Sequence, residues 1–252
     1  MSVQPLVSII TISRNSERTI RRTIESVLAQ SYPRCEYIIV DGASTDGTIS
    51  IIKEYGSKIA ALISEPDSGI SDAFNKGIKI SKGTYVQFIN ADDILPPDKI
   101  AHSMKIFDVH PDAAFVFGDI IKRSIDGREE IVSGDPTYAR SIRFVMNRVN
   151  HPTMVVKKEL FDRFGYFKLQ WKIAMDYDWI LRIHNAGMHG VYSSNIVVIT
   201  ESGGISDSSR FLAFKECRNI SIYHGINPIL AHCYYWARII KHIILSISGI
   251  RS

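Results

Sequence analysis

The first half of the chain alternates short apolar runs with segments in which apolar residues recur every three or four positions. The runs are rich in β-branched and aromatic residues, as is typical of buried strands, and lie at residues 7–12, 37–40, 59–64, 85–89 and 113–117. The periodic segments predict helices, which we expect at residues 20–28, 48–55, 71–80 and 96–109. Strands that alternate with helices predict an α/β fold with a mostly parallel sheet covered by helices on both faces.

Beyond Gly118 this alternation stops. Residues 120–132 predict a β-hairpin that turns at Asp126 and Gly127, because this pair favours tight turns. Two further helices are expected, at residues 159–164 and 179–186. The organisation that follows is one domain over residues 1–207, with halves at 1–118 and 119–207, and a helical tail over residues 208–252.

The tail is basic and amphipathic. From residue 210 onward it holds six Lys and Arg residues against Glu216 alone, so the net charge of +4 belongs to this segment. Arg238 and Lys241 interrupt its apolar run, which disfavours a membrane-spanning helix. We expect a helix on an anionic membrane surface, and the alternative is a terminal helix that packs on the core. The expected polar stripe of this helix consists of His232, Tyr235, Arg238, His242 and Ser246.

The overall composition is ordinary for a soluble globular protein. The 252 residues are 45% hydrophobic and 22% charged, which is enough for a core without disulfides. Cys35, Cys217 and Cys233 form no CxxC pair, so a reducing compartment is a simpler interpretation than a disulfide framework or a zinc site. Residues 1–6 lack the pattern of a signal peptide, so we expect a cytoplasmic protein. No dense basic patch indicates a nucleic-acid partner.

Acidic residues follow two of the predicted strands. Asp41 and the pair Asp92-Asp93 both lie at the carboxyl ends of strands, where open α/β sheets bind their ligands. Carboxylates suit Mn²⁺ or Mg²⁺, and such ions are often shared with substrate phosphates. Asp41 could instead accept hydrogen bonds from a nucleotide base or ribose. The alternatives are a helix cap for Asp92-Asp93 and an ordinary strand–turn–helix connection for Asp41.

A third polar group lies on the helix predicted at residues 71–80. Asp72, Asn75 and Lys76 are three or four residues apart, so they share one face of that helix. Asp72 is therefore a candidate for lining the site. Lys76 either meets a phosphate or stays solvated.

Taken together, these segments resemble the family 2 glycosyltransferases. The resemblance covers the first hundred residues and rests on the order and spacing of four segments: residues 7–15, 41–48 (DGASTDGT), 67–77 (DSGISDAFNKG) and 92–93 (DD). It implies a GT-A fold, which is a Rossmann-like α/β architecture. It also implies a nucleotide-diphospho-sugar donor, such as a UDP-sugar, and inversion at the anomeric carbon.

The resemblance implies roles for individual residues of this half. Asp41 would contact the base of the donor nucleotide, and Ser13 and Arg14 would lie in the loop that packs on that base. Asp93 would bind Mn²⁺ or Mg²⁺, and Asp92 would face the donor or the waters of the metal. Residues 1–118 would thus form the half that binds the nucleotide-sugar.

Residues 119–207 are similar to the acceptor half of the same family. There an aspartate that opens a helix serves as the catalytic base, and Asp176 matches it. The family often has an acid just before this aspartate, whereas this chain has Met175, so Asp178 is the runner-up. Helix capping is the alternative for both acids. His151 is a candidate for positioning the acceptor or approaching the leaving diphosphate, and a structural role is its alternative.

Residues 201–206 resemble a loop in the bacterial surface-polysaccharide branch of the family, which includes O-antigen, capsule and colanic-acid enzymes. The backbone amides of Gly203 and Gly204 could meet a phosphate there, or the segment is a plain turn. We expect an inverting glycosyltransferase that acts on a lipid-linked glycan at the cytoplasmic face of the inner membrane. The rival interpretations are a nucleotidyltransferase, which would need a glycine-rich basic loop after the first strand, and a non-catalytic sugar- or lipid-binding module.

Overall fold

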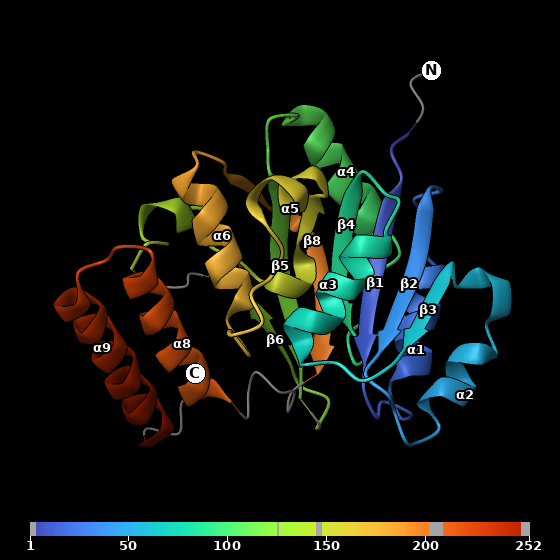
Figure 1. Cartoon of the computed structure of the whole chain (residues 1–252), viewed down its shortest axis with the longest axis horizontal. Coiled ribbons are helices and arrows are strands. Elements are labelled where there is room, and N and C mark those ends of the chain that lie inside the picture. The colour runs from blue at the N-terminus through green and yellow to red at the C-terminus, as the bar shows by residue number, and fades with distance from the viewer. Residues whose placement is uncertain (1–3, 125, 145–147, 202–208, 248–252) are drawn as a thin grey trace.

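The structure of the protein is a computed structural model, and it describes residues 4–124, 126–144, 148–201 and 209–247. Its centre is one mixed sheet with helices on both faces (Figure 1). The α/β class predicted from the alternating pattern is therefore confirmed.

The first half of the chain forms the parallel part of the sheet. Strands β3, β2, β1 and β4 lie side by side in that order and are joined by crossover helices. The strands are β1 (Val7–Ser13), β2 (Cys35–Asp41), β3 (Ala61–Ser64) and β4 (Tyr85–Asn90). The connecting helices are α1 (Ile20–Leu28), α2 (Thr48–Lys53), the short η1 (Gly56–Lys58) and α3 (Ile70–Ile80). Ser13, Asp41 and Ser64 share one register position, so the three strands end together.

The second half continues the sheet with mixed directions. Its strands are β5 (Phe115–Arg123), β6 (Glu129–Val132), β7 (Val155–Lys157) and β8 (Gly190–Glu201). The predicted hairpin is confirmed, because β5 and β6 pair antiparallel from Ile120 opposite Val132 to Arg123 opposite Glu129. The sequence pattern did not indicate β7, which pairs with both β4 and β5, or β8, which runs parallel to β5. The helical segments are α4 (Lys99–Val109), η2 (Tyr138–Arg140), η3 (His151–Thr153), α5 (Glu159–Phe164) and α6 (Met175–Asn185).

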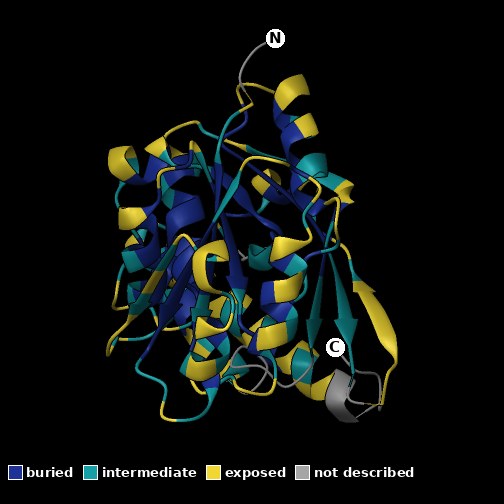
Figure 2. Cartoon of the chain, turned by 90° about the vertical axis from the view of Figure 1, so that its right-hand side faces the viewer, coloured by how far each residue is buried: buried dark blue, intermediate teal, exposed yellow. Residues whose placement is uncertain are grey.

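Alternating residues of the strands pack on opposite faces. In β1, Ile9 belongs to the core cluster that contains α1 and α4, whereas Ile10 belongs to the cluster that contains α3 and α6. These two layers are the dark blue interior in Figure 2. Gly77 lets α3 approach β1 closely, because a Cβ atom at this position would overlap the side chain of Ile10. The sheet therefore holds the loops at its carboxyl edge on a tightly packed base.

Two helices, α8 (Arg210–Tyr223) and α9 (Pro228–Ile247), pack side by side at the end of the molecule away from β3, with α9 outermost (Figure 1). The predicted polar stripe faces inward over part of its length. The Arg238 guanidinium lies 4.4 Å from the centroid of the Phe214 ring, Tyr235 lies under Arg218, and His242 contacts Phe211.

The outer surface of α9 is mostly apolar. Its most exposed large apolar side chains are Ile229, Trp236, Ile240, Ile243 and Ile244, and His232 and Lys241 are exposed as well. The helix is thus amphipathic as predicted, but Arg238 and its inward neighbours face α8 instead of water, because α8 offers aromatic rings that a guanidinium can stack on. Within the described part of the chain, no helix is both long and apolar enough to cross a membrane.

Candidate active site

Asp41 is the centre of a polar cluster at the carboxyl edge of the parallel strands. It is fully buried, and its Oδ1 accepts hydrogen bonds from the hydroxyls of Ser13, at 3.1 Å, and Ser44. Its Oδ2 accepts from the backbone N–H of Ser44 at 2.8 Å and from the Ser64 hydroxyl at 3.0 Å. Four donors fill the acceptor positions of a carboxylate. The predicted contact between Asp41 and a base stays a prediction, and Ser13 contacts Asp41 directly.

The loops after β1 and β2 are hydrogen-bonded to each other above this cluster. The N–H of Asn15 donates to Ser44 Oγ at 2.8 Å, and the N–H of Thr45 donates to Asn15 Oδ1 at 2.8 Å. Asn15 and Ala43 both have left-handed backbone conformations, with φ of 50° and 55°. Such conformations cost about 1–3 kcal/mol for residues other than glycine and concentrate at functional sites.

Arg14 and Asp67 lie on either side of Gly42. A side chain at position 42 would overlap the Asp67 carboxylate, and the Arg14 Cδ lies within 3.6 Å of the position that its Cβ would take. Asp67 also accepts a hydrogen bond from the N–H of Gly69 at 2.8 Å. Glycine at position 42 therefore leaves room for the Asp67 carboxylate and the Arg14 side chain at the end of β2. Arg14 is expected at the site from the sequence, whereas Asp67 is not, although its DxG spacing is a signal for it.

The pair Asp92-Asp93 forms a turn directly after β4. Asp93 is 3% exposed, and its Oδ2 accepts hydrogen bonds from the backbone and side-chain N–H groups of Asn90, at 3.2 and 3.0 Å. Burial and the negative charge of Asp92 raise the pKa of Asp93 to about 8. Burial also raises the pKa of Asp92, which is the more accessible of the two. Two crowded carboxylates that resist ionisation are a site at which a cation would relieve repulsion.

Glu201 brings a third carboxylate to this turn from the end of β8. Ile94 and Ile199 exchange backbone hydrogen bonds of 2.9 and 3.0 Å, and this bridge holds the two segments antiparallel. Glu201 pairs with Arg22 at 2.6 Å and its negative charge contributes to the raised pKa values of Asp92 and Asp93. No local sequence pattern indicates this contact, because it joins residues more than a hundred positions apart.

These carboxylates do not form a complete metal-binding set. Among the described residues, no three His, Cys, Asp or Glu side chains are arranged to hold a metal ion. Mg²⁺ and Mn²⁺ often take only one or two protein carboxylates and complete their coordination with water and substrate phosphates. The chemistry of Asp92 and Asp93 therefore fits such an ion together with a diphosphate.

The polar face of α3 is engaged within the protein. Asp72 Oδ2 accepts a hydrogen bond from the N–H of Ser68 at 3.0 Å, which is a cap at the start of the helix. Lys76 Nζ pairs with Glu65 at 2.8 Å and donates to the carbonyl of Pro66 at 2.8 Å. Lys76 is thus held by the preceding loop instead of being free in water. Its predicted contact with the donor stays a prediction.

Asp176 lies in the first turn of α6. It is 5% exposed, and its Oδ1 accepts a hydrogen bond from the N–H of Tyr177 at 2.8 Å. Burial, opposed in part by hydrogen bonds, raises its pKa to about 7, and the negative charge of Glu216 adds to this effect. Within the described part of the chain, Asp176 forms no ion pair. A carboxylate in such surroundings can accept a proton near neutral pH.

Asp178 differs from Asp176 because it is surrounded by cations. Its carboxylate lies 3.1 Å from Arg182, 3.0 Å from His224 and 3.6 Å from Lys168. Burial acts to raise its pKa, but the hydrogen bond from His224 and the charges of Arg182 and Lys168 outweigh burial and hold the pKa below its ordinary value. Asp178 therefore belongs to a cluster of charged side chains, in which Arg182 pairs with it at the i, i+4 spacing of a helix.

His151 packs among aromatic rings in front of β4. It stacks on Phe88 at 5.3 Å between ring centroids and contacts Phe74 and Phe167 edge-on. Its Nε2 is shielded from water and has no hydrogen-bond partner, and burial lowers its pKa to about 4. The ring is thus neutral at neutral pH. The other low-ranked candidates, Gly203 and Gly204, lie outside the described residues.

Residues 1–118 and residues 119–207 are linked through the segment before α6. The Ser71 hydroxyl donates to the carbonyl of Trp171 at 2.9 Å, and Lys172 Nζ donates to the carbonyl of Ser68 at 3.3 Å. These contacts place the chain segment that precedes Asp176 against the start of α3. In the described residues, no hydrogen bond or ion pair joins Asp176 directly to Asp41 or to Asp92-Asp93.

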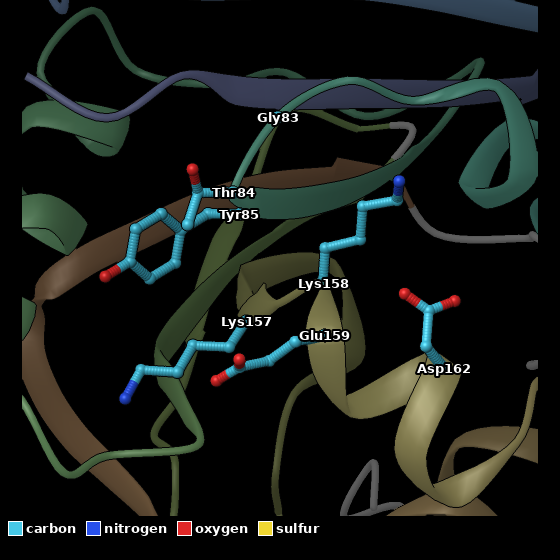
Figure 3. A pocket seen from close by; sticks show the side chains of 7 residues that line it. All are labelled: Gly83, Thr84, Tyr85, Lys157, Lys158, Glu159 and Asp162. Carbon is cyan, nitrogen blue, oxygen red and sulfur yellow. The ribbon is translucent and has the colours of Figure 1, made fainter.

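A shallow pocket of about 260 Å³ lies elsewhere, at the opposite edge of the sheet (Figure 3). It lies beside Tyr85, the first residue of β4, whereas Asn90 at the other end of that strand precedes the acidic pair. Its two lysines, Lys157 and Lys158, donate to the backbone carbonyls of other segments. The pocket contains none of the predicted site residues. Its lining consists of Gly83, Thr84, Tyr85, Lys157, Lys158, Glu159 and Asp162.

The chain is similar to curated glycosyltransferases over most of its length. It is 26% identical over 243 residues to the PGL/p-HBAD biosynthesis glycosyltransferase of Mycobacterium bovis, a match that covers 94% of this chain and 93% of the relative. It is 39% identical over 127 residues to TuaG of Bacillus subtilis, a glycosyltransferase assigned to teichuronic acid biosynthesis. That second match covers 49% of this chain and 50% of TuaG.

The fold is shared with solved structures. TarS of S. aureus in complex with UDP-GlcNAc superposes with a TM-score of 0.65 at 18% identity, over 94% of this chain and 72% of that one. The mannosyltransferase PcManGT of Pyrobaculum calidifontis, in complex with GDP-Man and Mn²⁺, gives a TM-score of 0.63 at 19% identity, over 96% and 76%. At this level of identity the likeness concerns the fold, and it confirms the predicted GT-A architecture.

A family model settles the assignment that these likenesses indicate. The model described as Glycosyl transferase family 2 matches residues 8–173, from β1 to the loop before α6. Because this match spans more than half of the chain, the protein belongs to glycosyl transferase family 2.

Proposed function

We propose that this glycosyltransferase is an inverting enzyme that moves a sugar from a UDP-sugar to a hydroxyl group of a lipid-linked glycan. The observation that carries the proposal is the environment of Asp176. A buried carboxylate with a pKa raised to about 7 and no cationic partner at the start of a helix is suited to take a proton.

The donor site lies at the carboxyl edge of β1, β2 and β4. Asp41, held by Ser13, Ser44 and Ser64, supports the two hydrogen-bonded loops on which a uracil base would rest. The exposed Arg14 offers a guanidinium at this edge, and Asp72 fixes the start of α3 next to it. The UDP-GlcNAc complex of TarS, which has the same fold, supports a donor of this class.

Asp92 and Asp93 would hold Mn²⁺ or Mg²⁺. The mutual crowding of the Asp92, Asp93 and Glu201 carboxylates supports this assignment, as does the Mn²⁺ complex of PcManGT. When bound, such an ion offsets the negative charge of the departing diphosphate. The protein itself keeps the pair in place through Asn90 and through the hydroxyl of Thr23, which donates to the Asp93 carbonyl at 2.8 Å.

The transfer would be a single displacement. Asp176 takes the proton from the acceptor hydroxyl as that oxygen forms a bond to the anomeric carbon. The bond between this carbon and the diphosphate oxygen breaks, and the nucleoside diphosphate leaves with the electron pair. One displacement inverts the configuration, and a positioned base contributes ~10²–10⁴ in rate. The start of α6 is fixed against α3 through Trp171 and Lys172, which supports a base held close to the donor site.

The outer face of α9 would rest on an anionic membrane. Trp236 is 56% exposed and Ile229 is 76% exposed, and both belong to an apolar face about 30 Å long by the rise of an α-helix. Lys241, an exposed residue of the same helix, supplies positive charge. Aromatic and aliphatic side chains beside basic groups are the signature of a helix that lies in the headgroup region. The protein would then work as a peripheral protein at the cytoplasmic face of the inner membrane.

This location supports the proposed acceptor. A lipid-linked saccharide would be presented at the surface on which α9 rests, and the names of the relatives place them in PGL/p-HBAD and teichuronic acid biosynthesis. We therefore assign the chain to bacterial polysaccharide biosynthesis of the O-antigen or capsule type.

The proposal is tested with a panel of nucleotide sugars, each with and without Mn²⁺. A saturating UDP-sugar should raise the Tm by roughly 2–8 °C, and more with Mn²⁺ than without it. The same UDP-sugar should be consumed in a transfer or donor-hydrolysis assay. Release of pyrophosphate from a nucleoside triphosphate supplied with a sugar 1-phosphate would instead indicate a nucleotidyltransferase, and stabilisation without any turnover would indicate a binding module.

A further inference from the structure

Glu216 lies on α8, within the predicted tail, and reaches into the segment before α6. It is 5% exposed. Its Oε1 accepts the N–H of Lys172 at 2.8 Å, and its Oε2 accepts the N–H groups of Ile173 and Ala174, both at 2.9 Å. One carboxylate thus binds three consecutive backbone amides.

These amides lead directly into the helix that carries Asp176. Ala174 is the N-cap residue of α6, and α6 has no side-chain cap of its own. The first N–H groups of a helix lack partners within the helix and carry partial positive charge, so a carboxylate is favoured there. Glu216, from another helix, binds the N–H of this N-cap residue and of the two residues before it, and without it these three amides, of which that of Ala174 is buried, would lose this acceptor.

The contact between α8 and α6 continues beyond Glu216. Ser221, on the same helix, lies 3.0 Å from the Tyr177 hydroxyl, and His224 at the end of α8 pairs with Asp178. Three successive residues of α6, beginning with Asp176, are thus bordered by α8. This helix belongs structurally to the acceptor side of the enzyme, although it lies in the part of the sequence that is predicted to be a tail.

We propose that Glu216 is a positioning residue for glycosyl transfer, which fixes the turn that presents Asp176 and keeps a negative charge beside it. The proposal rests on the proposed role of Asp176 as the base. Glu216 itself touches neither substrate nor reacting atoms, and it acts through α6.

None of the other ionisable groups near Asp176 in the described residues supplies an uncompensated negative charge, so this charge comes from Glu216. Cys217 on α8 has a pKa raised by burial to about 11, so its thiol is neutral at neutral pH. Arg238 from α9 acts on Cys217 and Tyr177. Asp178 on α6 is compensated by Arg182, Lys168 and His224. The negative charge of Glu216 is the one that raises the pKa of Asp176 beyond the effect of burial.

The test is the pH profile of kcat for three variants. Glu216→Gln removes the charge, so the acid limb should move to lower pH by roughly half a unit or more, because the ionised form of Asp176 is then less disfavoured. The kcat at neutral pH should fall by about 10-fold, because the amide cannot accept all three N–H groups, whereas KM for the donor should stay within about 2-fold. Glu216→Asp keeps the charge on a shorter side chain, so kcat should fall while the limb stays in place.

Ser221→Ala is the matched control, since it removes a polar contact of the same interface without a change of charge. Its acid limb should match that of the parent. An unmoved limb in Glu216→Gln, or a limb that moves equally in Ser221→Ala, overturns the proposal. If Glu216→Gln does not fold, the Glu216→Asp variant decides. A displaced acid limb in its pH profile overturns the proposal, whereas an unmoved acid limb with a lowered kcat supports it. Transfer by Asp176→Asn would overturn the base assignment itself, whereas an inactive Asp176→Asn with an unmoved Glu216→Gln limb overturns only the role of Glu216.

Discussion

Asn75 and Phe167 exchange two hydrogen bonds across the two halves of the enzyme. The Asn75 side-chain amide donates to the Phe167 carbonyl at 2.8 Å, and the Phe167 N–H donates to Asn75 Oδ1 at 3.0 Å. Asn75 lies on α3 in the donor half, whereas Phe167 lies in the segment that leads to α6. The Asn75 side chain thus pairs with the Phe167 backbone as a neighbouring strand would, and it holds the segment before α6 against α3.

Replacement of Asn75 by Ala should therefore lower both stability and turnover. It leaves a backbone N–H and a backbone C=O unpaired in a buried position, which costs about 1–3 kcal/mol. Chemical denaturation would measure this loss. Lys76→Gln is the control on the same helix, because it breaks a partly exposed ion pair with Glu65 and should cost less than ~1 kcal/mol. Equal losses in both variants would contradict the bridging role of Asn75.

The turnover number should rise with pH through the pKa of Asp176. Its raised value of about 7 means that the base is ionised above neutral pH and protonated below it, so activity is lost as the pH falls through that value. Asp176→Asn should still bind nucleotide but lose transfer, by ~10²–10⁴-fold. Calorimetric titration with UDP and a transfer assay on the same sample would separate the two effects.

Asp176→Asn should also stabilise the fold at high pH. Because the folded-state pKa of Asp176 is raised, the fold favours the protonated form, and the stability that this provides is lost as the pH rises from the unfolded pKa near ~4 to about 7. Asparagine removes this penalty. The Tm of the variant should exceed that of the parent by a few degrees at pH 8 and match it near pH 4, and the opposite trend would contradict the buried, unpaired state of Asp176.

Asp178→Asn should act in a different way. Removing this carboxylate leaves Arg182, Lys168 and His224 without their shared anion, and loss of one partner from a buried ion pair costs ~3–5 kcal/mol. A thermal melt should therefore show a large loss of stability, with activity reduced in proportion to the unfolded fraction. A stable Asp178→Asn variant that binds nucleotide but has lost transfer would make Asp178 the base instead of Asp176.

The succession of strands and helices along the first half of the chain, and the acids that follow two of the strands, could be predicted from the sequence. Both depend on local patterns. A parallel strand buried on both faces is a continuous apolar run, and Asp41 and Asp93 end two such runs. The strand β8 gave no such signal, since its residues Tyr192 to Asn195 are polar or partly exposed. Its partner β5 and the bridge to Ile94 come from distant parts of the chain.

Contacts between residues that are far apart in the sequence also determine which carboxylates are able to react. Asp176 and Asp178 are two residues apart, and from the sequence Asp176 is the expected base with Asp178 as the runner-up. They differ because Lys168, Arg182 and His224 converge on one of them and Glu216 lies near the other. The inward face of α9 is a further case, since periodicity identifies the stripe that contains Arg238 but not the aromatic partner that covers it.

Asp93→Ala should abolish metal-dependent turnover. The loss of Mn²⁺ affinity in the presence of UDP should exceed the ~10–100-fold that removal of an outer-shell partner costs. Calorimetry with Mn²⁺ and UDP would measure it. Asp98→Asn is a suitable control, because it removes the same charge from an exposed position five residues further along, where Asp98 accepts a hydrogen bond from Ser31. Near-normal turnover in Asp93→Ala would exclude the metal role of this residue.

The apolar face of α9 yields the last prediction. Trp236→Ser combined with Ile240→Ser should weaken binding to vesicles that contain anionic lipid by at least ~10-fold, because each side chain buries apolar surface worth ~1.5–3 kcal/mol when fully covered. Co-sedimentation with such vesicles measures this. Val109→Ser, an exposed apolar residue at the end of α4, should leave binding unchanged. If the double variant binds like the parent, α9 does not dock on lipid, and a change from dimer to monomer in light scattering would assign its outer face to a second copy of the chain.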